Sequence, residues 1–175
     1  DITTKLINFK NKKTKAKIIA KQDGIIAGLD FCRAAFKIIG KEAIFISKVK
    51  DGSKVKKNKV IAVIKAKTKT ILIAERTAIN FLNHASGIAS LTNQFVQKVK
   101  RKTKICCTRK TTPNLRLLEK YAVNKGGGYN HRYNLSDEIL IKDNHISAED
   151  SLKKLVKRAI KTKKIVTVEI ENLKQ

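Results

Sequence analysis

The stretch TRKTTPNLRLLEKYAVNKGGGYNHRYNLSDEILIKDNH, residues 108–145, carries the pattern that decides the fold. Directly before it, Ile105–Cys107 predicts a short strand. Thr112 and Pro113 predict the start of a helix that the glycines 126–128 end. A second apolar run, Ile139–Ile141, predicts a buried strand. Strands that alternate with capped helices are typical of a parallel sheet, so this stretch predicts βα units.

The βα pattern continues toward the end of the chain. Ser147, with Asp150 three residues later, predicts a capped helix over Ala148–Thr162, and Ile165–Ile170 predicts the next strand. A complete α/β barrel needs about 200–250 residues. The roughly 95 residues after position 80 (175 − 80) hold at most half of one. We therefore expect an incomplete barrel in a chain that is part of a longer protein.

The first part of the chain predicts a different architecture. Strands are expected at Ala16–Ala20, Ile25–Ala27, Ala43–Val49 and Val60–Ala66, and helices at Leu29–Ile39, Ile71–Leu82 and His84–Lys100. Gln22-Asp23-Gly24 is typical of a hairpin-like turn. The sequence thus predicts an α/β protein with an N-terminal α+β open sandwich at 1–80 and the first part of an α/β barrel at 81–175.

Composition sets looser bounds. The net charge is +26, but the lysines are scattered, which favours solvated faces over a nucleic-acid-binding surface with interleaved aromatics. The three cysteines show no repeated spacing, which argues against a disulfide framework or a four-cysteine zinc site and favours buried small hydrophobes. Neither an apolar run of about 20 residues nor a signal peptide is found in the sequence, so a cytoplasmic location is expected.

Charged side chains follow each predicted strand of the second part. Arg109 and Lys110 come after Ile105–Cys107, and Lys142 comes after Ile139–Ile141. Glu169 and Glu171 lie at the end of Ile165–Ile170. Ligands of parallel α/β folds bind beyond the carboxyl ends of the strands, so these side chains are expected on one rim. Arginine and lysine there suit a polyanionic small molecule, and a carboxylate beside them suggests Mg²⁺.

Simpler interpretations of these residues stay open. Arg109 and Lys110 fit a solvated loop, and His131 fits a surface histidine. Glu169 fits an ion pair with a core-facing lysine. The glycines 126–128 fit a helix stop, because no Lys-Ser or Lys-Thr follows them as a phosphate-binding loop requires.

Three long motifs resemble the quinolinate phosphoribosyltransferase family (nicotinate-nucleotide pyrophosphorylase, carboxylating). They are ERTAINFLNHASGIASLT at 75–92, TRKTTPNLRLLEKYAVNKGGGYNHR at 108–132 and ILIKDNH at 139–145. DITT at 1–4 and DGIIAG at 23–28 fit as well, so the resemblance covers essentially the whole chain.

The resemblance implies a cytoplasmic transferase of pyridine nucleotide and NAD biosynthesis, a pentosyltransferase. It would convert quinolinate and 5-phosphoribosyl-1-pyrophosphate with Mg²⁺ into nicotinate mononucleotide, pyrophosphate and carbon dioxide. It also implies a homodimer, or a higher oligomer, in which the sandwich of one subunit caps the barrel mouth of the other. No specific nucleic acid and no membrane are expected as partners.

The resemblance also assigns roles to particular residues. Four residues would bind quinolinate: Arg109, His131, Arg132 and Lys142. In the family the partner subunit contributes a further arginine to this site, and Arg76 resembles that arginine. Lys110 would reach the phosphoribosyl substrate, and Glu169 would lie near the ribose and hold Mg²⁺ directly or indirectly. Lys110, Lys142 and Glu169 are the expected catalytic residues.

The sequence departs from the family pattern at three positions. Cys107 stands where the family usually has Asp, and Asn58 and Asn114 stand at turn glycines, which Asn tolerates. Two alternatives therefore stay open within the resemblance. One is a related phosphoribosyltransferase-like protein of molybdate transport clusters, and the other is a copy that keeps the fold without activity.

Overall fold

The computed structural model describes residues 1–7, 12–100, 102–149 and 151–172. Its chain divides into two compact units. The first contains Asp1–Cys107 and Thr111–Asn130, and the second contains Thr108–Lys110 and His131–Gln175.

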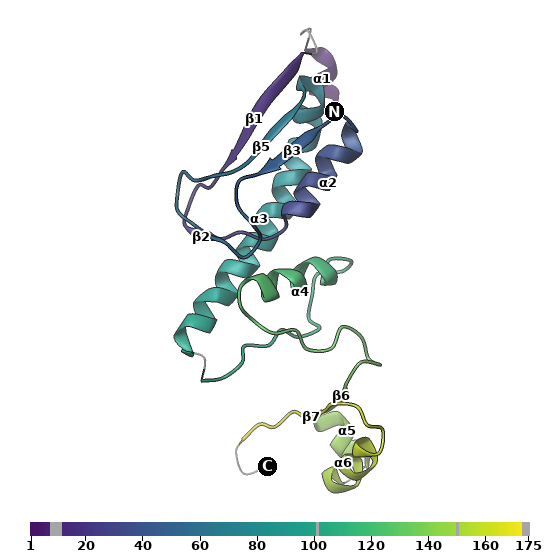
Figure 1. Cartoon of the computed structure of the whole chain (residues 1–175). Coiled ribbons are helices and arrows are strands. Elements are labelled where there is room, and N and C mark those ends of the chain that lie inside the picture. The colour runs from purple at the N-terminus through teal and green to yellow at the C-terminus, as the bar shows by residue number, and fades with distance from the viewer. Residues whose placement is uncertain (8–11, 101, 150, 173–175) are drawn as a thin grey trace. The chain divides into compact units, whose positions relative to one another are not determined.

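A three-stranded antiparallel sheet in the order β1–β5–β3 lies along one side of the first unit, next to the helices labelled α2 and α3 (Figure 1). Its strands are β1 (Lys13–Ile19), β3 (Ile44–Ser47) and β5 (Val60–Lys67). At the end of β5 the side chains alternate, with Ile64 and Ala66 buried and Lys65 and Lys67 exposed. This alternation gives the sheet one apolar face that must be covered.

Two helices, α2 (Leu29–Ile39) and α3 (Thr68–Lys98), pack against each other and join the sheet in one hydrophobic core. The bounds of α2 agree with those predicted from the sequence. Gly28, just before α2, has φ +96°, which a residue with a side chain rarely adopts. A Cβ there would also lie 3.0 Å from the Cβ of Ala85 on α3, so glycine permits this close approach.

The prediction of two helices at 71–82 and 84–100 was wrong, because α3 is one helix of 31 residues. Its buried residues Ala74, Ala78, Leu82, Ala85 and Ala89 keep helical spacing through the expected break. Neither glycine nor proline lies between Leu82 and Ala85, so nothing in the backbone ends the helix there.

Helix α4 (Arg116–Lys125) packs on the second half of α3. The contact is close because alanines line it, and a Cβ at Gly126 would lie 2.4 Å from the carbonyl oxygen of Ala89. Gly126 and Gly127, which has φ +90°, end the helix as the sequence predicts. The helix begins three residues later than expected, after Leu115, and Thr112 does not cap it.

Three short elements complete the first unit: α1 (Ile2–Leu6), β2 (Gly24–Ile25) and β4 (Lys54–Val55). β2 pairs with β4, whereas β1 pairs with β5. The turn at 22–24 therefore does not join two paired strands, contrary to the hairpin expected from its sequence. The strand expected at 105–107 is reduced to a single parallel bridge between Cys106 and Tyr129.

The second unit contains the parallel pair β6 (Ile139–Ile141) and β7 (Val166–Val168), as predicted for βα units. Helices α5 (Asp143–Glu149) and α6 (Leu152–Ile160) connect the two strands. One helix was expected over 148–162, but the Ser151 side chain accepts a hydrogen bond from the Lys154 backbone and caps α6. The capping role predicted for Asp150 lies outside the described residues.

Within the part of the chain that the structure describes, none of the helices combines the length and apolar character needed to cross a membrane.

Candidate functional site

Lys142 and Glu169 meet at the carboxyl edge of the β6–β7 pair. Ile141 lies opposite Val168 in the register, so the residues that follow each strand leave the sheet side by side. The backbone nitrogen of Glu169 donates to the carbonyl oxygen of Ile141 at 2.9 Å. Nζ of Lys142 lies 3.1 Å from Oε2 of Glu169. The expected sharing of one rim is confirmed for this pair.

The simpler interpretation of Glu169, an ion pair with a core-facing lysine, is thus confirmed only in part. Glu169 does pair with a lysine, but the Lys142 side chain is 38% exposed and the Glu169 carboxylate is 57% exposed. Both groups remain accessible to a ligand. An exposed ion pair of this kind contributes about 0–1 kcal/mol, so a bound dianion or metal ion can displace it at small cost.

His131 lies beside the same strand pair. Its Nε2 is 3.4 Å from Oγ1 of Thr167, which lies in β7, and 3.3 Å from Oε2 of Glu138, which directly precedes β6. The side chains of His131 and Glu138 are mostly buried, at 24% and 20% exposed. Sequence reasoning missed Glu138, because the fold of the loop between residues 132 and 138 brings it back to His131 and no local pattern predicts that.

The other cations expected in the site are distributed over both units. Arg109 and Lys110 belong to the Thr108–Lys110 segment of the second unit, and Arg132 follows His131 in the same unit. Arg109 and Arg132 are half-buried and Lys110 is exposed. Arg76 lies exposed on α3 in the first unit. The roles of all these residues stay predictions.

The cysteines differ in part from the expected buried hydrophobes. Cys32 is fully buried, Cys107 is half-buried, and Cys106 is exposed. The three are free thiols, as the absence of a disulfide framework in the sequence predicts. Sγ of Cys107 lies 3.0 Å from Nζ of Lys120, a lysine only 1% exposed. Sequence reasoning missed this contact, because lysine is seldom buried and its spacing on α4 does not mark it.

The two asparagines at expected turn glycines adopt the backbone conformation that those turns require. Asn58 has φ +69° and Asn114 has φ +63°, both in the left-handed region. Asparagine enters this region more readily than other residues with side chains. These two departures from the family pattern are therefore structurally mild.

A dedicated metal cluster is not found among the described residues, where no group of three or more His, Cys, Asp or Glu side chains gathers. Mg²⁺ is commonly held by one or two carboxylates together with substrate phosphates. The exposed carboxylate of Glu169 at the strand edge fits that mode of binding.

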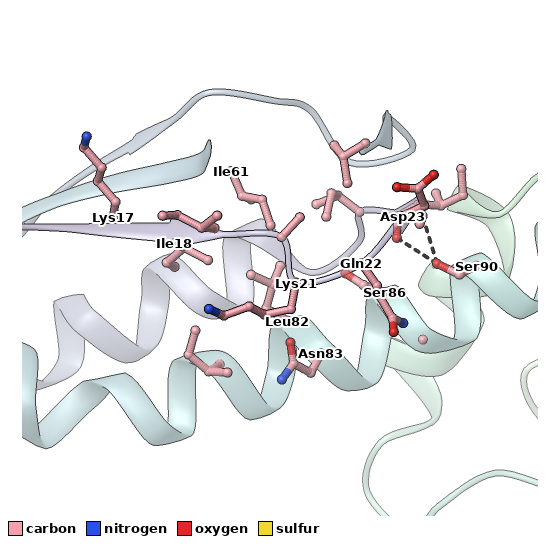
Figure 2. Close-up of a pocket in the computed structure, with 18 residues that line it drawn as sticks. Lys17, Ile18, Lys21, Gln22, Asp23, Ile61, Leu82, Asn83, Ser86 and Ser90 are labelled. Carbon is pink, nitrogen blue, oxygen red and sulfur yellow. Dashed lines mark hydrogen bonds between the residues drawn. The ribbon is translucent and has the colours of Figure 1, made fainter. Parts of the chain in front are cut away.

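A cavity of about 570 Å³ lies in the first unit, between the segment around the β1–β2 turn and α3 (Figure 2). Figure 2 shows Asn83, Ser86 and Ser90 on the helix beside this segment. Oγ of Ser90 accepts a hydrogen bond from the backbone nitrogen of Ile25 at 2.8 Å, so it fastens the segment to the helix. None of the residues predicted for the site lines this cavity.

Comparison with known proteins identifies the relatives of this chain. The quinolinate phosphoribosyl transferase N-terminal domain matches residues 1–86, and the C-terminal domain of the same family matches residues 88–175. The chain belongs to the quinolinate phosphoribosyltransferase family. The family resemblance stated from the motifs is confirmed.

Among the relatives are two proteins named Probable nicotinate-nucleotide pyrophosphorylase (carboxylating). The Bacillus subtilis protein is 41% identical over 98% of this chain and 60% of its own length. The protein from Methanocaldococcus jannaschii is 42% identical over 100% of this chain and 62% of its own length. The chain thus spans about three fifths of these relatives.

Solved structures agree with the family. NadC from Streptococcus pyogenes is 42% identical, with a TM-score of 0.92 over 99% of this chain and 64% of that one. The nicotinate-nucleotide pyrophosphorylase from Francisella tularensis is 40% identical, with a TM-score of 0.92 over 99% of this chain and 62% of its own. The predicted fold class, an α+β sandwich followed by part of an α/β barrel, is confirmed.

Proposed function

We propose that the protein carrying this chain transfers the phosphoribosyl group of 5-phosphoribosyl-1-pyrophosphate to quinolinate. The pyridine then loses one carboxylate as carbon dioxide, which gives nicotinate mononucleotide and pyrophosphate. The observation that carries the proposal is the meeting of Lys142 and Glu169 at one strand edge, in a chain about 40% identical to proteins named probable nicotinate-nucleotide pyrophosphorylase (carboxylating).

The charges of the second unit suit a pyridine dicarboxylate. Quinolinate has two adjacent carboxylates, and Arg109, Arg132 and Lys142 supply cations in the same unit. Arginine binds carboxylates in a planar, bidentate manner, and lysine adds a compact charge. Electrostatic interactions strengthen where water is excluded, so these groups would bind the dianion most strongly in an enclosed pocket.

His131 and Lys142 are assigned different tasks in the reaction. His131, held beside β7, would orient one carboxylate of quinolinate. Lys142 would leave Glu169 and pair with the substrate instead. The ring nitrogen gains positive charge when it bonds to the ribose, and that charge stabilises the carbanion left when carbon dioxide departs. The carbanion then takes up a proton to give nicotinate mononucleotide. The positive charges of Arg109, Arg132 and Lys142 would lower the free energy of the transition state through electrostatic interactions with the developing negative charge.

Glu169 is the residue proposed to hold Mg²⁺, together with phosphate oxygens of the substrate. When bound, the ion would neutralise negative charge on the pyrophosphate group. We also propose that two chains assemble so that Arg76 serves the site of the partner subunit.

Calorimetric titration of quinolinate, with nicotinate as the competing ligand, tests the proposal. We expect quinolinate to bind more tightly, and Arg132→Ala to abolish binding. Arg158→Ala is the matched control, because Arg158 lies in the same unit and pairs with Glu149. Preference for nicotinate, or unchanged affinity in Arg132→Ala, would contradict the assignment.

A further inference from the structure

Two neighbouring residues of α4 reach the two ends of the loop that carries Arg109 and Lys110. Oε2 of Glu119 accepts a hydrogen bond from the backbone nitrogen of Thr112 at 3.2 Å. Nζ of Lys120 lies 3.0 Å from Sγ of Cys107. Cys107 immediately precedes residues 108–111 and Thr112 immediately follows them. One helix therefore contacts both ends of this four-residue loop.

We propose that Glu119 and Lys120 form a loop clamp, a pair of positioning residues that fixes the backbone on both sides of Arg109 and Lys110. The clamp lies wholly within the first unit. Its consequence for catalysis rests on the proposed function, in which Arg109 and Lys110 bind the substrates.

The Glu119 end of the clamp is itself held in place. Oε1 of Glu119 lies 2.9 Å from Nε2 of His84 on α3, and the Glu119 side chain is only 13% exposed. Burial raises the pKa of this carboxyl, but hydrogen bonds from Thr112 and His84 outweigh burial and hold the pKa below its usual value. Glu119 is therefore a carboxylate at neutral pH, with one oxygen on the loop and the other on α3.

Further bonds fix the same two ends. Beside Thr112, Nε of Arg116 donates to Oγ1 of Thr111 at 3.2 Å. At the other end, the backbone nitrogen of Cys107 donates to the carbonyl oxygen of Tyr129 at 3.0 Å. Lys120, at 1% exposed, is enclosed by protein where it contacts Cys107. Side chains of α4 thus hold both ends of the loop. The backbone bonds between the segment at Cys106–Cys107 and Tyr129 hold the first end as well.

Anchored ends restrict what the loop can do. A short segment with both ends fixed has few conformations, so ordering its side chains on ligand binding loses little entropy. A clamp of this kind lowers the cost of placing Arg109 and Lys110 against a polyanion. Releasing one end should therefore weaken substrate binding even when the fold is intact.

Hydrogen exchange tests the clamp without any ligand. We expect Glu119→Ala to accelerate amide exchange at Thr111 and Thr112 by about tenfold or more. Glu119→Gln should stay near the wild-type rate, because its amide oxygen still accepts the hydrogen bond from Thr112. Asp30→Asn, which alters an exposed carboxylate of α2, should leave the loop unchanged. Unaltered exchange in Glu119→Ala would overturn the clamp.

Calorimetric titration tests its consequence. We expect Glu119→Ala to weaken quinolinate binding by about tenfold or more, and Glu119→Gln to restore most of the loss. Tyr121→Phe is the matched control, because it removes a hydrogen bond of α4 to Asp51 and leaves the loop contacts in place. Equal weakening in Tyr121→Phe and Glu119→Ala would mean general destabilisation and would overturn the positioning role.

These experiments distinguish a failure of the proposed function from a failure of the clamp. A wild-type protein that does not bind quinolinate would overturn the proposed function, while hydrogen exchange would still decide whether the clamp exists. If Glu119→Ala does not fold, exchange and affinity in Glu119→Asp decide the matter. That variant keeps the carboxylate on a side chain one methylene shorter, so its reach to Thr112 is lost, and it should show smaller changes in the same directions. Wild-type values in Glu119→Asp would overturn the clamp.

Discussion

The three thiols differ sharply in their surroundings. Burial, and then the negative charge of Asp51, raise the pKa of Cys32 to about 12. Cys106 is exposed and Cys107 is half-buried. We expect iodoacetamide at about pH 8 to alkylate Cys106 first and to leave Cys32 unmodified in the native protein. Peptide mass spectrometry measures this, and denaturant should make all three react. Alkylation of native Cys32 as fast as Cys106 would contradict the prediction.

Glu119 should make the free energy of unfolding depend on pH in the acid range. Its folded-state pKa is lowered, so its contribution is fully present above the unfolded carboxyl pKa of about 4.3 and is lost as the pH falls through the folded value. We expect the wild type to be more stable than Glu119→Gln by about 1 kcal/mol at neutral pH. Urea unfolding at a series of pH values should show this difference shrink below about pH 4. A difference that grew in acid would contradict the prediction.

Individual residues were predictable from sequence where local chemistry decides them. Asn58 and Asn114 were expected to accept turn geometry, and both have positive φ. Glu138 beside His131, and Lys120 beside Cys107, were not foreseen. Glu138 reaches His131 through the fold of the loop between them, and Lys120 of α4 reaches Cys107 in the segment before that helix. Both contacts depend on how irregular segments fold and pack, and the chain carries no local signal for them.

At the scale of elements, the turn at Asp51 ties together three parts of the first unit. Its carboxylate accepts hydrogen bonds from the backbone nitrogens of Gly28 and Leu29 at 3.1 and 3.2 Å, at the start of α2. It also accepts one from the hydroxyl of Tyr121 on α4 at 2.6 Å. Burial, and then this carboxylate, raise the pKa of Tyr121, so the phenol remains a donor at physiological pH.

Replacing this carboxylate should destabilise the whole first unit. We expect Asp51→Ala to lower the free energy of unfolding by about 3 kcal/mol, because the start of α2 loses its acceptor and the partly buried hydroxyl of Tyr121 loses one too. Tyr121→Phe should cost less, about 1–2 kcal/mol, because it removes both the hydroxyl and its need for a partner. Urea unfolding measures both values. A smaller loss in Asp51→Ala than in Tyr121→Phe would refute this account.

Helices and strands were predictable where their period or their end signals are strong. The bounds of α2 and β6 match the sequence pattern. Two errors concern where helices end: α3 continues through Asn83, and α5 and α6 are separate because Ser151 caps the second. Asparagine and serine are compatible with either a helix interior or an end, so tertiary packing decides between the two outcomes.

At the scale of the molecule, the high net positive charge comes mostly from lysines outside the candidate site. In the sheet of the first unit, Lys13 lies opposite Lys67 and Lys15 lies opposite Lys65 on neighbouring antiparallel strands. Like charges directly opposite each other destabilise a strand pair. The net charge of +26 adds repulsion across the whole chain. The scattered lysines agree with solvated faces, and the fold must tolerate their repulsion.

Salt should therefore stabilise this protein. Raising sodium chloride from about 20 mM to about 300 mM shortens the range of charge repulsion, and we expect the melting temperature to rise by a few degrees, roughly 2–4 °C per kcal/mol gained. Lys15→Glu should reduce this dependence, because it places opposite charges on β1 and β5, and it should raise the melting temperature most at low salt. Differential scanning calorimetry measures both effects. A melting temperature that fell steadily with salt would mean that favourable ion pairs outweigh the repulsion among the lysines.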